Sequence, residues 1–402
     1  MALHSAMTAP DEAEATLKAV VALRPSIMDV RDHIEQQRCL PPQLVRELKE
    51  AGVFRMTMPR AWGGSELDPA AQLRVLEELS SADASVGWCA TIGCDTGYFS
   101  AYMDQTVAHQ MFSDPDMVTG GNLARAAGRA VRVAGGYRVS GHWPFASGCR
   151  HADWMIGSCM VYDGDTQVTT ATDLPVTRVC FFPPERCQIL DTWHTTGMRG
   201  TGSHDFTVTD LFVPEERTFS LQSLQPLRSS PLYAFFPFVG GKFGAVPLGV
   251  ARAAIEATID LACRSNARQV ITGGKLTPKH PVSEENYMQV GIARAEALVG
   301  SARSYLYEQT AQVWEQLVAG QRPSPADTAR YTLSYINAYT TCREAVDQLF
   351  CLAGAAAVYS SGALDRLLRD MRTVAQHVLA GPHSYEMVGR LLLGAEPIAL
   401  FT

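Results

Sequence analysis

Two segments of this chain combine glycines, hydroxyl side chains and aromatic rings at points where strands are expected to end. The first runs from Trp143 to Cys149 and contains Ser147; the second runs from Trp193 to Asp205 and contains Thr201 and Ser203. Glycine lets a backbone approach a flat ligand closely, and exposed N–H and O–H groups can bond its polar edge. The two segments therefore predict a site for a flat cofactor with a polar edge, such as a flavin.

A histidine near the C-terminus, His377, is the titratable group that could act on a molecule bound beside such a cofactor. The ordinary pKa of an imidazole lies near neutrality and burial can tune it, so histidine suits a general base. A structural alternative is a residue at a helix C-terminus whose ring satisfies backbone carbonyls. His383 follows beyond Gly381-Pro382, and we interpret it either as a second polar group of the pocket or as a surface residue.

The periodicity of apolar residues changes twice along the chain. Up to about residue 113 it is helical, with one continuous buried helix expected over 85–103. The period then falls to two, and Gly135-Gly136 between alternating runs marks a hairpin. From about residue 244 long helical segments return, the first of them expected over 245–273.

This pattern predicts an α+β chain in three parts. An N-terminal α-helical domain is followed by a middle β-domain, built as a small barrel or sandwich. A lid loop rich in aromatic residues then leads into a C-terminal antiparallel four-helix bundle, as long helices with short breaks indicate. The predicted boundaries of the three parts are residues 1–115, 116–222 and 223–402.

The composition of the 402 residues is that of an ordinary globular protein, with 47% hydrophobic and 19% charged residues. A net charge of −7 argues against nucleic acid and anionic membranes as partners. No apolar run approaches the about 20 residues that span a bilayer, and the polar N-terminus lacks a signal core, so we expect a cytoplasmic protein. The ten cysteines lack the spacing of a zinc or redox motif. We interpret them as buried, reduced thiols, and no metal site is predicted.

The order of helices, β-domain and bundle, together with these motifs, resembles the acyl-CoA dehydrogenase fold along nearly the whole chain. The runs from Trp143 to Ala152 and from Gly197 to Ser203 are similar to the flavin-dependent monooxygenase branch of that superfamily, which includes the oxygenase components of two-component systems. The resemblance implies hydroxylation of a small aromatic or heteroaromatic substrate, of the phenol or indole type, through a flavin C4a-hydroperoxide. That species would form from O2 and reduced FMN or FAD, supplied by a separate NAD(P)H-flavin reductase, and the chain indeed has no GxGxxG nicotinamide motif.

The resemblance also assigns roles to residues at matching positions. It implies that His377 is the base that activates the substrate and that Ser147 bonds the flavin near its N5 atom. Implied flavin contacts are Asn122, Trp193, Thr201, Ser203, Arg268 and Arg369, with Arg268 reaching the flavin of a neighbouring subunit in a homotetramer. Asp95 stands where some hydroxylases place a histidine that touches the substrate, and an aspartate there could bind an indole N–H or an amine. Phe236 of the aromatic lid and His383 are the other predicted substrate contacts. Turn-forming serines, packed aromatic rings and solvated arginines are the structural alternatives.

The main alternative function is an acyl-CoA dehydrogenase or oxidase with bound FAD, in which a carboxylate removes the substrate's α-proton. The glutamate of that motif is absent, and His377 stands near its place. Glu386 lies beyond Pro382 and is a poor substitute for the missing base. Some dehydrogenases carry the base on another helix, and Glu256 is the candidate there. A non-catalytic member of the same fold is the third possibility.

Overall fold

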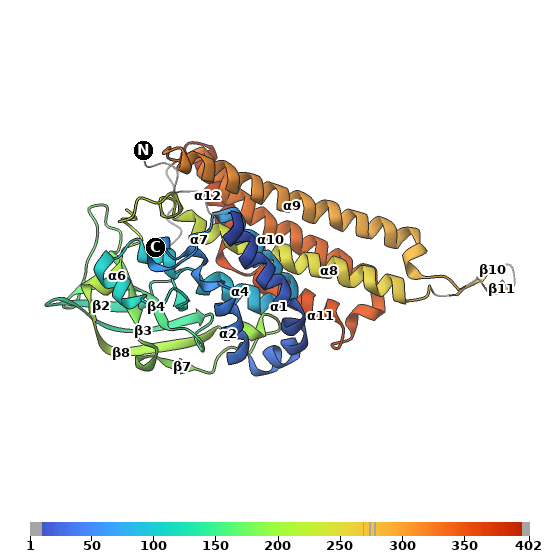
Figure 1. Cartoon of the computed structure of the whole chain (residues 1–402), viewed down its shortest axis with the longest axis horizontal. Coiled ribbons are helices and arrows are strands. Elements are labelled where there is room, and N and C mark those ends of the chain that lie inside the picture. Colours follow the sequence, from blue (N-terminus) through green and yellow to red (C-terminus); the bar gives the residue numbers. More distant parts are fainter. Residues whose placement is uncertain (1–9, 268, 273–274, 277–278, 396–402) are drawn as a thin grey trace.

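The computed structural model describes residues 10–267, 269–272, 275–276 and 279–395. The molecule is elongated, with the strands at one end and the long helices at the other (Figure 1). This confirms the α+β order of helices, strands and bundle. The helices that precede the strands are α1 (Pro10–Gln37), α2 (Pro42–Glu50), α3 (Pro69–Ala82), α4 (Ala84–Gly93), α5 (Thr96–Ser100) and α6 (Gln105–Met111).

The predicted continuous helix over 85–103 is wrong, because two helices, α4 and α5, lie there. α4 begins where the Asp83 carboxylate accepts hydrogen bonds from two backbone N–H groups of its first turn. It ends because the Thr57 hydroxyl donates to the carbonyl oxygen of Cys94. In a continuous helix that oxygen would accept the amide of the residue four positions later. The break directs Asp95 into the interior.

The strands of the middle part form one hydrogen-bonded sheet in the order β7-β8-β3-β2-β4-β6-β9, with β1 and β5 paired to β4. The predicted hairpin around Gly135-Gly136 joins β2 to β3. β4 runs parallel to β1 and β2, so the sheet is mixed. The strands are β1 (Thr119–Asn122), β2 (Gly128–Val133), β3 (Gly136–Ala146), β4 (Trp154–Asp163), β5 (Thr166–Gln167), β6 (Thr177–Phe182), β7 (Gln188–Leu190), β8 (His204–Pro214) and β9 (Thr218–Phe219).

A bulge near the end of β3 determines which aromatic side chains reach the surface. The pairing of β3 with β8 shifts between Trp143 and Ala146, and Phe145 has φ +59°, which is costly for a bulky residue. Trp143 is fully buried and stacks on Phe206 with centroids 4.9 Å apart. Phe145 is 63% exposed. Because of the bulge, Ser147, which lies just beyond the strand, does not follow the regular alternation of side chains between the two faces of the sheet.

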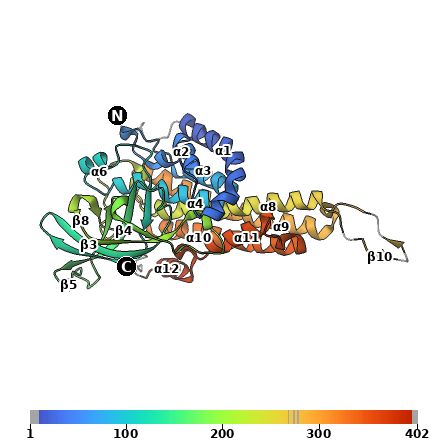
Figure 2. The ribbon, with the colours of Figure 1, turned by 90° about the horizontal axis from the view of Figure 1, so that it is seen from below.

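The C-terminal part is a bundle of long helices that extends away from the sheet (Figures 1 and 2). Its first helix, α8, ends at Arg264 rather than near residue 273, because the chain from Ser265 turns and bonds back to the segment before α9. A short hairpin, β10–β11, projects beyond the bundle. The elements are α7 (Pro237–Gly241), α8 (Ala245–Arg264), β10 (Ile271–Thr272), β11 (Lys275–Leu276), α9 (Asn286–Val318), α10 (Pro325–Ala353), α11 (Ala363–Val374) and α12 (Pro382–Leu392).

The predicted lid loop is packed into the interior. The Tyr233 hydroxyl donates to the carbonyl oxygen of Thr57 at 2.9 Å, and Phe235 and Phe238 both contact the ring of Tyr331 in α10. These contacts join the N-terminal helices, the lid segment and the bundle in one hydrophobic core, while the sheet has a second core around Trp143. In the described part of the chain, no helix has both the length and the apolar character to cross a membrane.

Candidate functional site

Three hydroxyl side chains from the two glycine-rich segments form a connected chain of hydrogen bonds. Ser147 Oγ lies 2.7 Å from Ser203 Oγ, which lies 2.6 Å from Thr201 Oγ1. Thr201 donates its only hydroxyl proton to the carbonyl oxygen of Met198, at 2.8 Å. At the other end, the indole N–H of Trp88 donates to Ser147 Oγ at 2.9 Å. All four side chains are buried.

These contacts fix the direction of every hydrogen bond in the chain. Because Thr201 gives its proton to Met198, it must accept from Ser203, and Ser203 must therefore accept from Ser147. A hydroxyl has one donor and two acceptor lone pairs. Ser147 accepts from Trp88 and donates to Ser203, so it keeps one lone pair and no proton for a further partner. Ser147 can accept one more hydrogen bond but cannot donate one.

Backbone contacts hold the two glycine-rich segments against each other. Gly148, with φ +73°, donates its N–H to the carbonyl oxygen of Thr201 at 3.0 Å. A side chain at Gly200 would collide with Ile34, so a glycine here lets the second segment lie close against α1. The sequence places these segments about fifty residues apart, and the pairing of β3 with β8 brings their ends together.

His377 lies in a box of aromatic rings built from three helical elements. Its ring meets the edge of Trp88 in α4 with centroids 5.0 Å apart. It stacks on Phe243, which belongs to the short helix Lys242–Gly244, at 5.4 Å, and on Tyr339 of α10 at 6.5 Å. Burial lowers the pKa of His377 to about 4, because a buried imidazole loses the hydration of its charged form. The ring is therefore neutral at physiological pH, and its unprotonated nitrogen can accept a hydrogen bond from a bound molecule.

The depressed pKa of His377 predicts a specific dependence of stability on pH. Between pH 6.5, where the unfolded side chain titrates, and about pH 4, the unfolded chain binds a proton at this position that the folded chain does not. Stability therefore falls as pH falls through this window, and His377 accounts for about 2 kcal/mol of that loss at pH 5. The free energy of unfolding can be measured in urea at pH 7 and at pH 5. Its decrease between the two pH values should be about 2 kcal/mol smaller for His377→Phe than for the wild type. Equal losses in both proteins would contradict the burial argument.

Two buried polar atoms of this box have no hydrogen-bond partner. They are Nδ1 of His377 and the hydroxyl oxygen of Tyr339. A buried polar atom left unpaired costs about 1–3 kcal/mol, so groups of this kind indicate a place where a ligand or a small rearrangement completes the bonding. Together with the acceptor site on Ser147 and the surrounding rings, they suit a flat ligand that carries N–H and carbonyl groups. The residues present therefore fit a flavin and an aromatic substrate.

Trp88 is a site residue that the sequence analysis missed. It connects the two predicted catalytic residues, because its indole N–H bonds Ser147 while its ring contacts His377. The sequence signal was a single tryptophan within the apolar run from Ser85 to Met103. A buried tryptophan usually finds a partner for its N–H, which could have marked Trp88 as more than core packing.

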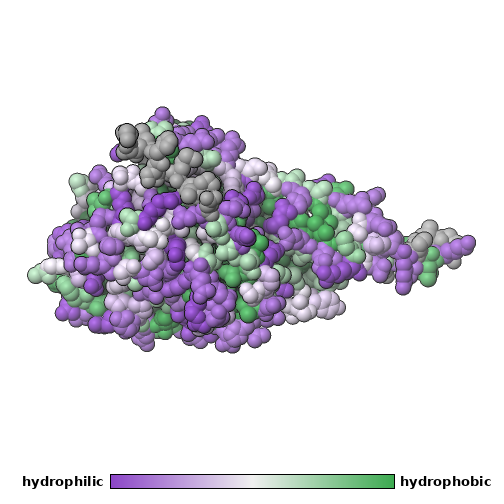
Figure 3. Space-filling view, viewed as in Figure 1, coloured by the Kyte–Doolittle hydropathy of each residue, from purple (hydrophilic) through white to green (hydrophobic). Residues whose placement is uncertain are grey.

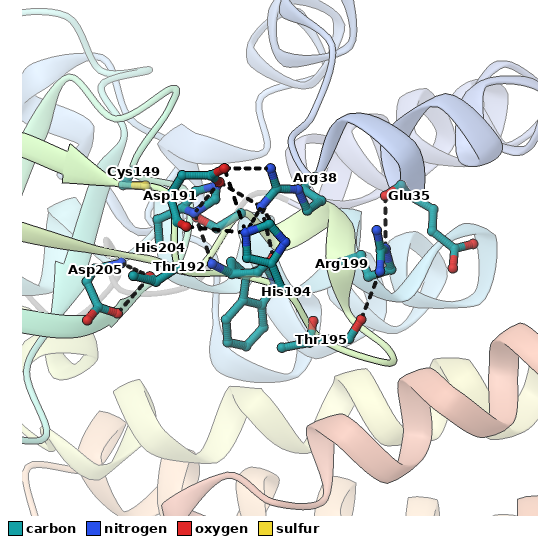
Figure 4. A network of polar contacts seen from close by, with 12 residues as sticks. Glu35, Arg38, Cys149, Asp191, Thr192, His194, Thr195, Arg199, His204 and Asp205 are labelled. Carbon is teal, nitrogen blue, oxygen red and sulfur yellow. Dashed lines mark hydrogen bonds and ion pairs between the residues drawn. The ribbon is translucent and has the colours of Figure 1, made fainter.

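The loop that carries Trp193 is held by a polar network at the C-terminal end of α1 (Figure 4). The Arg38 guanidinium donates to the carbonyl oxygen of Trp193 at 3.2 Å and pairs with Asp191 at 2.7 Å. The backbone N–H of Trp193 donates to Nδ1 of the fully buried His204 at 3.2 Å. The Trp193 ring then faces Phe145, 6.0 Å away between centroids. Two aromatic rings thus form a partly exposed wall beside the hydroxyl chain.

Asn122 and Arg369 make contacts within the protein. The Asn122 amide donates to the carbonyl oxygen of Pro144 at 2.7 Å and accepts from the N–H of Ala124. Arg369 pairs with Glu35 of α1 at 2.6 Å and with Asp365 at 2.9 Å. Both residues therefore support the backbone around the glycine-rich segments, and a direct flavin contact for either remains a prediction. Arg268 lies outside the described residues.

The three predicted substrate contacts are dispersed. Asp95 is buried and forms an ion pair with Lys242. Phe236 is half-buried and meets the edge of the Tyr102 ring, with centroids 5.5 Å apart. His383 is exposed on the first turn of α12, 3.6 Å from Glu386. Of the three, Asp95 is joined to the His377 box, because Lys242 precedes Phe243 in the same short helix.

The two carboxylates considered as a dehydrogenase base lie on the surface. Glu256 pairs with Arg24 at 2.8 Å and its side chain is 51% exposed. The side chain of Glu386 is 60% exposed. Neither of them contacts the rings around His377 in the described part of the chain. The group that stands among these rings is an imidazole. The same part of the chain contains no cluster of metal-binding side chains.

Comparisons with known proteins agree with this site. The chain matches the family models of the acyl-CoA dehydrogenase N-terminal domain (residues 10–105) and C-terminal domain (residues 242–382). The indole-3-acetate monooxygenase of Pseudomonas putida is 31% identical over 97% of this chain and 97% of its own. The HsaA monooxygenase from M. tuberculosis superposes with a TM-score of 0.86 at 26% identity, over 97% of this chain and 100% of that one. XiaF from Streptomyces sp., solved in complex with FADH2 and glycerol, gives 0.86 at 25% identity, over 98% of both chains. The chain therefore belongs to the acyl-CoA dehydrogenase family and, within it, to the flavin-dependent monooxygenases, oxidoreductases that use reduced flavin and O2.

Proposed function

We propose that this chain is the oxygenase component of a two-component system that hydroxylates a small aromatic substrate of the indole or phenol type. Reduced FMN or FAD would come from a separate NAD(P)H-flavin reductase, in the cytoplasm. The observation that carries the proposal is the neutral imidazole of His377 in an aromatic box, at the position where a dehydrogenase needs a carboxylate. The name of the Pseudomonas relative favours an indole-type substrate.

Each part of the site has a task in this reaction. When bound, reduced flavin supplies the activated oxygen atom that is transferred to the substrate. The free lone pair of Ser147 suits the N–H that reduced flavin carries at N5, whereas oxidised flavin presents an acceptor there. His377 accepts a hydrogen bond from a phenol O–H or an indole N–H and takes up that proton as the ring attacks the oxygen, when the proton has become acidic. The rings of Trp88, Phe243 and Tyr339 shield part of the half-buried His377 ring from water.

The decisive experiment mixes the purified chain with chemically reduced flavin, O2 and a panel of indoles and phenols. Oxygen incorporation from 18O2 into one of these compounds, without any reductase present, supports an oxygenase component. An acyl-CoA dehydrogenase would instead purify with tightly bound FAD, which an acyl-CoA would bleach. That outcome, with no hydroxylated product, would overturn the proposal.

Replacing Trp88 with phenylalanine should reduce the ratio of product to H2O2 by about threefold to tenfold. The variant keeps a ring beside His377 but removes the hydrogen bond that Ser147 accepts, a loss of about 1 kcal/mol. Without that bond, the Ser147 hydroxyl can rotate and hold the reduced flavin less well. Product and H2O2 measured in the same reaction check the ratio. A variant with the wild-type ratio would show that Trp88 only packs.

A homotetramer is part of the same proposal. Large apolar side chains of the bundle lie exposed, among them Ile259, Tyr287, Val290 and Tyr359. Apolar residues also gather on the bundle face visible in Figure 3. Exposed apolar surface of this kind supports an interface between subunits, and light scattering on the purified protein measures the number of chains.

A further inference from the structure

A buried ion pair lies next to the His377 box and has no role in the proton transfer described above. The side chains of Lys242 and Asp95 are 3% and 4% exposed. The ammonium group of Lys242 donates to the Asp95 carboxylate and lies 3.4 Å from the carbonyl oxygen of Val239. Two apolar residues often replace a buried ion pair at no loss of stability. Packing alone therefore does not account for a charged pair at this position.

The position of the pair relates it directly to the predicted base. The nitrogen of Lys242 lies 5.1 Å from the centroid of the Phe243 ring, and that ring stacks on His377. Asp95 lies in the turn between α4, which carries Trp88, and α5. The Phe243 ring thus contacts both the cation of the pair and the His377 ring.

The hydrogen-bonding capacity of the pair favours an anionic group. An ammonium group has three donors, and the contacts of Lys242 take up two of them, one at the long distance of 3.4 Å. An amine on the substrate would place a second cation beside the same carboxylate. Burial raises the pKa of Asp95 to about 6, so this carboxyl takes up a proton at little cost when a second carboxylate approaches.

We propose that Lys242, which Asp95 holds in position, binds the carboxylate of an aromatic acid whose ring lies against Phe243 and within reach of His377. The inference rests on the proposed function and narrows its substrate class to aromatic acids with a short acidic arm. In this arrangement the ion pair anchors the arm, and the distance between Lys242 and His377 determines which ring atom faces the oxygen donor.

A pair of compounds that differ only in the carboxylate tests this assignment. Indole-3-acetate and 3-methylindole share the ring and the first side-chain carbon. Equilibrium dialysis with anaerobically reduced flavin gives the two dissociation constants, and the kcat/KM values of the hydroxylation give a second ratio. The wild type should favour indole-3-acetate by at least tenfold on both measures. Lys242→Met should reduce this preference at least tenfold, whereas Lys242→Arg should keep part of it.

Two further variants separate recognition from folding. Lys242→Met leaves Asp95 buried without its partner, so the double variant Lys242→Met/Asp95→Asn replaces the pair by neutral groups of similar size. It should have a wild-type circular dichroism spectrum and should also lose the preference. Lys49→Met, which breaks a partly exposed pair with Asp153, is the control and should keep the preference.

The outcomes distinguish this inference from the function on which it rests. A double variant that still favours indole-3-acetate, or a wild type that binds both compounds equally, would overturn the role of Lys242 while hydroxylation of either compound sustains the oxygenase. If no indole or phenol is hydroxylated in the presence of reduced flavin and O2, both proposals fall.

Discussion

Replacing His377 with alanine should leave oxygen consumption largely intact and reduce the hydroxylated product by about 100-fold or more, as expected for the loss of a general base. The reason is the isolation of this imidazole. It is neutral at physiological pH because its pKa lies near 4, and its Nδ1 atom has no hydrogen-bond partner within the described chain. Without it, the substrate keeps its proton and its ring is a weaker nucleophile, so the activated oxygen is released as H2O2. The measurement compares O2 consumed, product formed and H2O2 released in one reaction.

The controls for this variant address packing and specificity. Alanine leaves a gap between Trp88 and Phe243, so His377→Gln, which fills more of that space, should show the same loss of product. His33→Ala changes an exposed histidine on α1 and should behave as the wild type. A normal product yield from both His377 variants would remove this residue from the mechanism and reopen the search for a carboxylate base.

Replacing Ser147 with alanine should weaken the binding of reduced flavin by about tenfold and leave the binding of oxidised flavin nearly unchanged. The loss of the one hydrogen bond between Ser147 and the flavin accounts for about 1.4 kcal/mol, which is a factor of ten. The effect is selective because Ser147 can only accept a further bond, and only reduced flavin offers a proton at N5. Anaerobic titration with reduced flavin and aerobic titration with oxidised flavin measure the two affinities.

Two other substitutions test whether the direction of the hydroxyl chain matters. Thr201→Val removes the proton donor to Met198 and the acceptor for Ser203, so Ser147 becomes free to donate. This variant should bind oxidised flavin more tightly relative to reduced flavin than the wild type does. Ser100→Ala removes a buried hydroxyl that bonds its own helix and should change neither affinity. Equal losses for both flavin forms in Ser147→Ala would contradict the selectivity.

The sequence by itself determined the order of the elements and the location of the two glycine-rich segments. Apolar residues that recur with a period of two or 3.6 indicate which side of a strand or helix is buried. Glycines indicate where the backbone must turn or lie close to another group. The hairpin at Gly135-Gly136 and the placement of Ser147, Thr201 and Ser203 near strand ends follow from such local rules. The family resemblance supplied the expected role of His377.

Only the tertiary structure decided which side chains surround that histidine and how they are bonded. Trp88, Phe243 and Tyr339 come from three elements that are distant in the sequence. Asp95 and Lys242 are 147 positions apart. The pattern of apolar residues around either of them does not indicate an ion pair. The physical reason is that local patterns encode the burial of each element, whereas the partner of a buried polar group depends on how separate elements pack. For that reason the direction of the hydroxyl chain and the place of the buried cation could be derived only from the folded chain.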